Sequence, residues 1–157
     1  MKKKGCFRNV LIALGIIIVL AVAGFIFLGK NDIEEYQTGL AAEMTECSTK
    51  LDALSQRWDE KDEDLLFDSD YISDMHVKIN DFENYCTNFY DENAPAELAK
   101  MNDMLNEADI NYSQAADYMR SGIDDLDAGK LEISADFMDA GHEKLYEASD
   151  WFENHFD

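Results

Sequence analysis

The chain has 157 residues and a formal net charge of −21, from 34 acidic and 13 basic side chains. An acidic surface repels nucleic acid and anionic lipid headgroups, which argues against a nucleic-acid partner. All acidic residues lie after position 30, whereas five basic residues lie at or before it. Residues 31–157 therefore carry 34 acidic and eight basic side chains, a net charge of −26. Such a surface would attract cations, basic peptides or basic protein faces.

The first thirty residues have the pattern of a membrane anchor. A tip over residues 1–9 carries three lysines and one arginine, and Val10–Leu28 contains no charged or polar side chain. As a helix, this apolar run would be roughly 28 Å long, about the thickness of the hydrocarbon core of a bilayer. We therefore expect a basic tip at 1–9 and a single transmembrane signal anchor over 10–29.

The distribution of charge predicts how the anchor is oriented. Basic residues flanking a span stay in the cytoplasm, and the four in the tip outnumber Lys30 on the other side. The tip is therefore expected to be cytoplasmic, and residues 30–157 to form an extracytoplasmic domain at the cell membrane. A cleaved signal peptide is the alternative, because Ala21-Val22-Ala23 has the form of a cleavage site. Cleavage after Ala23 would release a secreted domain.

The rest of the chain has a helical pattern, with one proline and no strand-like alternation. Apolar residues recur at alternating steps of three and four, the spacing of a buried helix stripe and of coiled coils. Four stripes predict helices over about 33–62, 70–91, 95–125 and 130–155. Because the connections are short, we expect an all-α fold in which an antiparallel up-down-up-down four-helix bundle follows the transmembrane helix. The stripes comprise Ile33, Tyr36, Leu40, Met44, Cys47, Leu51, Leu54, Trp58; Ile72, Met75, Ile79, Phe82, Cys86, Phe89; Leu98, Met101, Leu105, Ala108, Tyr112, Ala115, Met119, Ile123; and Phe137, Gly141, Leu145, Ala148, Phe152, with Leu131 and Ile133 near the start of the last.

The stretch Pro95–Ala148 combines a proline-led helix, a tyrosine-rich middle, a glycine-ended turn and a last helix rich in alanine and glycine. It resembles the helical domains of small uncharacterised membrane-anchored envelope proteins of Gram-positive bacteria. The resemblance covers about a third of the chain. It implies a helical bundle in the cell envelope and no particular activity.

Two cysteines form the most specific pair in the sequence. Cys47 and Cys86 lie on the stripes of the first two predicted helices, at nearly the same level of an antiparallel hairpin. An oxidising exterior permits a disulfide there, which would stabilise the fold by roughly 4 kcal/mol on the chain-entropy model. The alternative is a pair of buried free thiols that pack as small apolar residues.

Recognisable catalytic motifs are absent from the sequence. It has no glycine-rich phosphate loop, no nucleophile elbow and no Cys-x-x-Cys-His. Its three histidines do not supply the paired Glu-x-x-His motifs of a di-iron bundle. We therefore expect a protein that is not an enzyme, with no catalytic residue, no cofactor and no dedicated metal site.

An acidic stretch offers a weak candidate for divalent-cation binding. Asp68, Asp70 and Asp74 have spacings found among calcium ligands, but the stretch lacks the mid-loop glycine and the terminal glutamate of an EF-hand. The alternative interpretation is a solvated helix turn in which aspartates cap the second helix.

Aromatic residues outside the stripes form a candidate binding patch, because aromatic side chains dominate interface hot spots. The alternative is that they flank the core, since a bundle buries more than a narrow seam. The candidates are Tyr71, Tyr85, Tyr90, Tyr118, Tyr146 and Trp151.

These patterns favour a membrane-anchored extracytoplasmic binding or interaction protein without catalysis, with a protein or basic peptide as its partner. Alternatives are an extracytoplasmic sensor, an accessory subunit of a membrane complex, and a structural or immunity protein. A sensor would need a partner protein to carry its signal across the membrane. The span has no Gly-x-x-x-Gly face, so the sequence predicts no particular oligomeric state.

Overall fold

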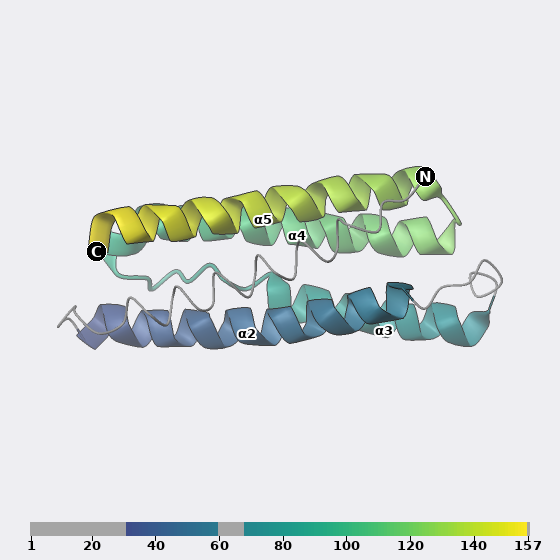
Figure 1. Ribbon diagram of the computed structural model, residues 1–157, viewed down its shortest axis with the longest axis horizontal. Coiled ribbons are helices and arrows are strands. Elements are labelled where there is room, and N and C mark those ends of the chain that lie inside the picture. The colour runs from purple at the N-terminus through teal and green to yellow at the C-terminus, as the bar shows by residue number, and fades with distance from the viewer. Residues whose placement is uncertain (1–30, 60–67, 157) are drawn as a thin grey trace.

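The computed structural model describes residues 31–59 and 68–156. These residues form an all-α fold without strands, which confirms the predicted fold class at that level. A 3-10 turn, η3, precedes the third of the four helices (Figure 1). The elements are α2 (Asn31–Asp59), α3 (Ser69–Cys86), η3 (Ala96–Leu98), α4 (Ala99–Asp124) and α5 (Ala128–Phe156).

Consecutive helices run in opposite directions (Figure 1). Between α2 and α3, Cys47 is bonded to Cys86 and Arg57 pairs with Asp74, so residue numbers rise along one helix as they fall along the other. The connection from α3 to α4 runs along the bundle before α4 begins, and α4 then packs along α5.

Two glycines allow α4 and α5 to approach closely. A Cβ atom at Gly141 would lie 2.6 Å from Cε1 of Tyr112, and one at Gly122 would lie 2.7 Å from Cδ2 of Leu131. Real Cβ atoms do not tolerate such distances. The glycines of the last two helices therefore set the spacing of this helix pair, and Tyr112 fills the space beside Gly141.

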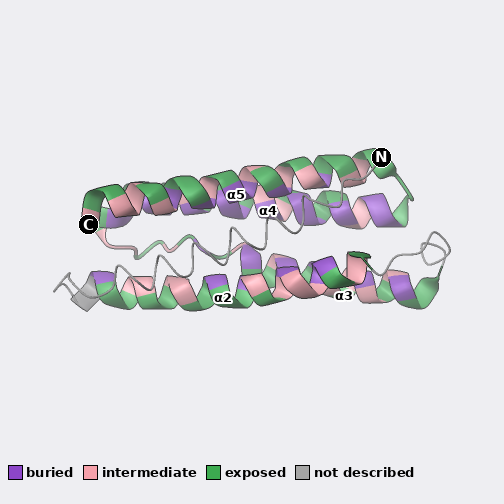
Figure 2. Cartoon of the chain, in the orientation of Figure 1, coloured by how far each residue is buried: buried purple, intermediate pink, exposed green. Residues whose placement is uncertain are grey.

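The predicted stripes form the core of the bundle. In the second and third stripes every residue is buried except Ile72, which is partly buried (Figure 2). In the fourth stripe, Met138 is buried in place of Phe137, whose ring stacks on Tyr118 at a centroid distance of 5.6 Å, and Ile133 is 40% exposed. A helical stripe is wider than a two-residue seam, so adjacent positions such as these compete for the same core space.

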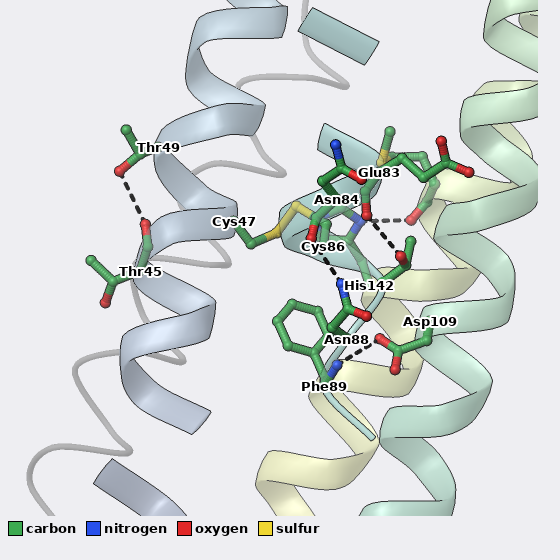
Figure 3. The surroundings of a disulfide bond; sticks show 12 residues. Thr45, Cys47, Thr49, Glu83, Asn84, Cys86, Asn88, Phe89, Asp109 and His142 are labelled. Atoms are coloured by element: carbon green, nitrogen blue, oxygen red, sulfur yellow. Dashed lines mark hydrogen bonds between the residues drawn. A yellow bond between two sulfur atoms is a disulfide. The ribbon is translucent and has the colours of Figure 1, made fainter. Parts of the chain in front are cut away.

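Cys47 and Cys86 form a disulfide bond, which confirms the predicted pairing. Their Cα atoms are 4.8 Å apart, and both residues are buried (Figure 3). The bond joins the middle of α2 to the last residue of α3. It therefore fixes the point at which the chain leaves the helical hairpin.

The second predicted helix is shorter than expected. It was predicted over 70–91, but α3 ends at Cys86, and residues 87–95 form a non-helical segment that we call the α3–α4 connection. The backbone N–H groups of Phe89 and Tyr90 bond to the side chain of Asp109 on α4 and not to earlier carbonyls of α3. A tertiary contact thus replaces the helical hydrogen bonds that the local pattern predicted.

The other predicted helix ends lie within a few residues of the observed ones. The predicted helix over 33–62 is seen as far as Asp59, and residues 60–67 lie outside the described part of the chain. Of the helices that the structure describes, none is both long and apolar enough to cross a membrane. The expected tip at 1–9 and the expected anchor at 10–29 lie outside the described residues.

Candidate functional site: an acidic cleft between α2 and the α3–α4 connection

A cleft of about 740 Å³ lies between the N-terminal half of α2 and the α3–α4 connection. This acidic cleft is lined by Glu35, Tyr36, Gly39, Leu40 and Glu43 from α2, and by Asn88, Phe89, Tyr90, Asp91, Glu92, Asn93 and Pro95 from the opposite side. Ligand-binding clefts have volumes of about 300–1,000 Å³. Two smaller pockets of about 60 and 120 Å³, with mainly apolar linings, lie where α2 approaches α5. The acidic cleft is therefore the better candidate site.

The α2 wall of the cleft is a single face of the helix. Glu35, Gly39 and Glu43 follow one another at intervals of four residues, which places them above one another on the helix surface. Beyond the adjoining residues and backbone of α2, no atom of the described chain lies within 4 Å of the position that a Cβ would take at Gly39. The face thus consists of two carboxylates separated by a stretch of open backbone.

Two buried polar residues of α4 hold the opposite wall. The Asp109 carboxylate accepts hydrogen bonds from the backbone N–H of Phe89 at 3.1 Å and of Tyr90 at 2.9 Å (Figure 3). Asn102 Oδ1 accepts from the N–H of Asp91 at 3.1 Å, and Asn102 Nδ2 donates to the Asp91 carbonyl at 2.8 Å. Three N–H groups and one carbonyl of this non-helical wall are therefore bonded to side chains behind it.

Tyr36 links the two walls. Its hydroxyl donates to Asn102 Oδ1 at 3.1 Å, so the same amide oxygen accepts from α2 and from the connection. The bond is partly buried and joins positions that are 66 residues apart in the sequence. Asn102 thereby fixes the width of the acidic cleft at its base.

The acidic groups at the cleft perturb one another. Burial raises the pKa of Glu43, and the nearby charges of Asp109 and Asp91 raise it further. Asp109 is 8% exposed, and burial raises its pKa from 3.8 to about 6, although the two backbone N–H groups favour the charged form. Burial followed by the charges of Asp91, Glu43 and Asp109 also raises the pKa of Tyr36. Burial is the largest cause of all three shifts, and neighbouring negative charge adds to it at Glu43 and Tyr36.

Basic side chains pair with carboxylates elsewhere in the bundle. Within residues 31–59 and 68–156, no basic side chain forms an ion pair with Glu35, Glu43, Asp91 or Glu92. The lysine and arginine pairs lie elsewhere in the bundle, and His76 Nε2 lies 2.8 Å from Asp124 Oδ1. The lysine and arginine pairs are Lys50–Asp81, Arg57–Asp74, Arg120–Glu83, Arg120–Asp117, Lys130–Asp125, Lys144–Glu107 and Lys144–Glu147. The cleft is thus a concave surface on which the negative charge has no cationic partner from the described chain.

Two of the three aspartates considered as cation ligands have other side-chain contacts, and Asp70 is exposed in the first turn of α3. Asp68 caps α3, and its Oδ1 accepts from the N–H groups of Asp70 at 2.8 Å and Tyr71 at 3.1 Å. Asp74 Oδ2 pairs with Arg57 Nε at 2.8 Å. In the part of the chain that the structure describes, no group of three or more His, Cys, Asp or Glu side chains is arranged to hold a metal ion.

The aromatic candidates are distributed over several elements. Tyr71 is buried, and its hydroxyl donates to the Arg57 carbonyl at 3.2 Å. Tyr90 is 45% exposed and lines the acidic cleft. The remaining four have separate surroundings: Tyr85 lies under Lys50, Tyr118 stacks on Phe137, Trp151 stacks on His155, and Tyr146 is exposed on α5.

Sequence reasoning did not identify Asn102 and Asp109, which build the cleft. Both are buried, with 6% and 8% of their surface exposed. They are seven residues apart, beside the apolar stripe of α4, and this regular placement of two polar residues at the edge of a core stripe was the available signal. The partner segment that they bind could not be inferred from that spacing.

No protein-family model matches the chain, and searches of curated proteins and of solved structures also found no match. The functional argument therefore uses the shape, charge and hydrogen bonding of the acidic cleft.

Proposed function

We propose that this chain is a membrane-anchored extracytoplasmic binding protein, without catalytic activity, whose acidic cleft binds a basic segment of a protein partner. The observation that carries the proposal is the concave surface on which carboxylates from α2 and from the α3–α4 connection converge without a basic partner in the described chain. A bound cation would relieve the repulsion that raises the pKa of Glu43.

Binding is favoured over catalysis because the buried polar groups at the cleft already have structural contacts. Both Asp109 oxygens accept backbone N–H groups, and Asn102 is used by Tyr36 and by the connection. Groups held in this way are suited to maintaining a preformed shape. The exposed carboxylates of Glu35 and Glu43 are left to contact a ligand.

The proposed location brings the cleft close to the membrane. With residues 10–29 in the bilayer and the basic tip inside the cell, Glu35 follows the end of the span by only six residues and Glu43 by fourteen. The partner would therefore meet the cleft near the outer surface of the membrane. A membrane protein with a basic external segment fits this position.

A crosslinking pull-down tests the proposal. The full-length protein, as wild type and as Glu35→Gln/Glu43→Gln, would be crosslinked to its neighbours in membranes of the source cells. It would then be extracted with a neutral detergent and recovered by pull-down. The matched control is Asp136→Asn/Glu143→Gln, which removes the same charge from exposed positions on α5. We expect a partner that is lost in the cleft variant, retained in the control and weakened by salt. Equal recovery with all three proteins would refute the cleft as the binding site.

A further inference from the structure

The geometry of the acidic cleft specifies what kind of basic segment fits, an inference that rests on the proposed function. Glu35 and Glu43 are eight residues apart in one continuous helix, which separates them by about 12 Å along the helix axis. Gly39 lies halfway between them on the same face, with no atom of the described chain, beyond the adjoining residues and backbone of α2, within 4 Å of its Cβ position. The two carboxylates are therefore separate contact points on either side of an open floor.

The size and lining of the cleft distinguish between classes of cation. A volume of about 740 Å³ is far larger than a metal ion or a single ammonium group needs, and it lies within the range of clefts that hold drug-sized ligands, so it has room for part of a peptide. Tyr36, Leu40 and Tyr90 add apolar and aromatic surface to the lining. Such surface packs against the methylene stems of lysine and arginine and attracts their charged ends.

The hydrogen bonds of the opposite wall determine how a peptide could be recognised. The N–H groups of Phe89, Tyr90 and Asp91 all bond to side chains of α4. The wall therefore cannot offer these donors to an added β-strand, which is one common way to bind an extended peptide. With these three donors occupied, recognition along this wall depends mainly on the side chains of the ligand.

We infer that the acidic cleft binds an extended peptide in which two cationic side chains, four residues apart, lie beside Glu35 and Glu43. An extended chain advances about 3.3 Å per residue, so positions i and i+4 are about 13 Å apart, close to the separation of the carboxylates. Side chains at i and i+4 also project from the same side of an extended chain, whereas those at i and i+3 project from opposite sides. Residues at i and i+2 share a side but are only about 7 Å apart.

A set of peptides with equal charge tests the spacing. Capped glycine–serine decapeptides with two lysines at i+2, i+3, i+4 or i+5 would be titrated calorimetrically into the full-length protein in neutral detergent at low salt. We expect the i+4 peptide to bind about fivefold more tightly than the others, because only it reaches both carboxylates from one side. Glu35→Gln/Glu43→Gln should weaken the i+4 peptide by about tenfold, and Asp136→Asn/Glu143→Gln should leave it unchanged.

The open floor at Gly39 supplies a second pair of variants. Gly39→Phe places a ring between the two carboxylates and should remove the preference for i+4, whereas Gly39→Ala should retain it. Helicity and thermal midpoint measured by circular dichroism show whether each variant is folded. If Gly39→Phe is unfolded, the test is the effect of Glu35→Gln/Glu43→Gln on binding of the i+4 peptide.

Three results would overturn the inference. Equal affinity for all spacings would mean general charge attraction, and failure of every peptide to bind would remove the peptide site. A linear diamine of matching length that binds as tightly as the best peptide would identify a small amine as the ligand. The proposed function is judged separately, by whether the crosslinked partner depends on Glu35 and Glu43. A partner that depends on them, with no spacing preference, would refute only the inference.

Discussion

Asp109 is the residue on which the acidic cleft depends most. It is buried in a bundle with few cations, yet both of its oxygens accept backbone N–H groups from the α3–α4 connection. Burial disfavours the carboxylate, whereas the two N–H groups favour it, and burial dominates because the pKa rises to about 6. At neutral pH, the buried Asp109 carboxylate therefore lowers the stability of the bundle, while its hydrogen bonds hold the α3–α4 connection in place.

This conflict predicts a specific pH dependence for Asp109→Asn. Because the folded pKa of about 6 exceeds the ordinary value of 3.8, the folded protein binds this proton more tightly than the unfolded chain does. Protonation thus stabilises the wild type as the pH falls through this window, and that stabilisation is lost as the pH rises through it. Relative to Asp109→Asn, the wild type should gain about 2 kcal/mol between pH 7 and pH 4, and about 3 kcal/mol once the pH is well below 3.8.

Urea unfolding of both proteins at several pH values measures this difference. Other carboxylates contribute to both curves and largely cancel, so the quantity of interest is the change with pH in the difference between the two unfolding free energies. The constant part of the difference includes the N–H group that loses its acceptor in Asp109→Asn. Parallel curves from pH 7 to pH 4 would contradict the raised pKa of Asp109.

Two glycines should respond in opposite ways to the same substitution. Gly141→Ala would place a Cβ atom 2.6 Å from the ring of Tyr112, so we expect a loss of about 1–3 kcal/mol from overpacking. Gly39→Ala enters open space within α2 and should add up to about 1 kcal/mol, because alanine favours the helix. Urea unfolding of both variants measures the change in unfolding free energy relative to the wild type, which should be negative for Gly141→Ala and positive for Gly39→Ala. A stabilised Gly141→Ala would mean that α4 and α5 approach less closely than described.

At the scale of elements, the disulfide connects helix packing to the cleft. Cys86 is the last residue of α3 and directly precedes the connection, and Cys47 lies one helical turn beyond Glu43 on α2. The bond therefore joins the two walls at one end of the cleft. Asp109 and Asn102 hold the following residues of the connection.

The double variant Cys47→Ala/Cys86→Ala should lose about 4 kcal/mol of stability, because the sequence separation of 39 residues closes a long loop. Exchange of the amide hydrogens of Phe89, Tyr90 and Asp91 should also become faster, because one end of the wall loses its covalent tether. Urea unfolding and hydrogen-exchange mass spectrometry measure the two effects. Cys6→Ala is the matched control and should change neither. Unchanged exchange in the double variant would mean that Asp109 and Asn102 hold the wall without the disulfide.

At the scale of the whole molecule, positive and negative charges are distributed unevenly. Lys50, Arg57 and Arg120 bridge α2 to α3 or α3 to α4, and Lys144 bridges α4 to α5. The few cations of the described residues thus lie mainly at helix–helix contacts. The cleft lies beside the non-helical connection, where no described cation bridges two elements. Its carboxylates therefore have no ion-pair partner in the described chain and are available to a ligand.

The sequence predicted the parts of this fold that depend on local periodicity. Stripes at steps of three and four located the four helices, and the level of Cys47 and Cys86 in the hairpin predicted the disulfide. The end of α3 was not predicted, because residues 87–91 have the apolar spacing of a helix. In the structure they are non-helical, and their N–H groups bond to Asn102 and Asp109 on α4. The cleft depends on those contacts, so it could not be found from local patterns.

The remaining prediction concerns the whole chain, whose first thirty residues decide where the cleft is displayed. The sequence predicts an apolar helix of roughly 28 Å behind a basic tip, and we propose that it remains in the membrane and keeps the domain outside. Protein isolated from membranes should therefore have the full-length mass, and alkylation of unreduced, denatured protein should label only Cys6. Reduction should release Cys47 and Cys86 for labelling, since the proposed oxidising exterior would maintain their bond. A mass that begins at Gly24 would instead indicate a secreted domain, and free labelling of both bundle cysteines in a full-length chain would contradict the proposed topology.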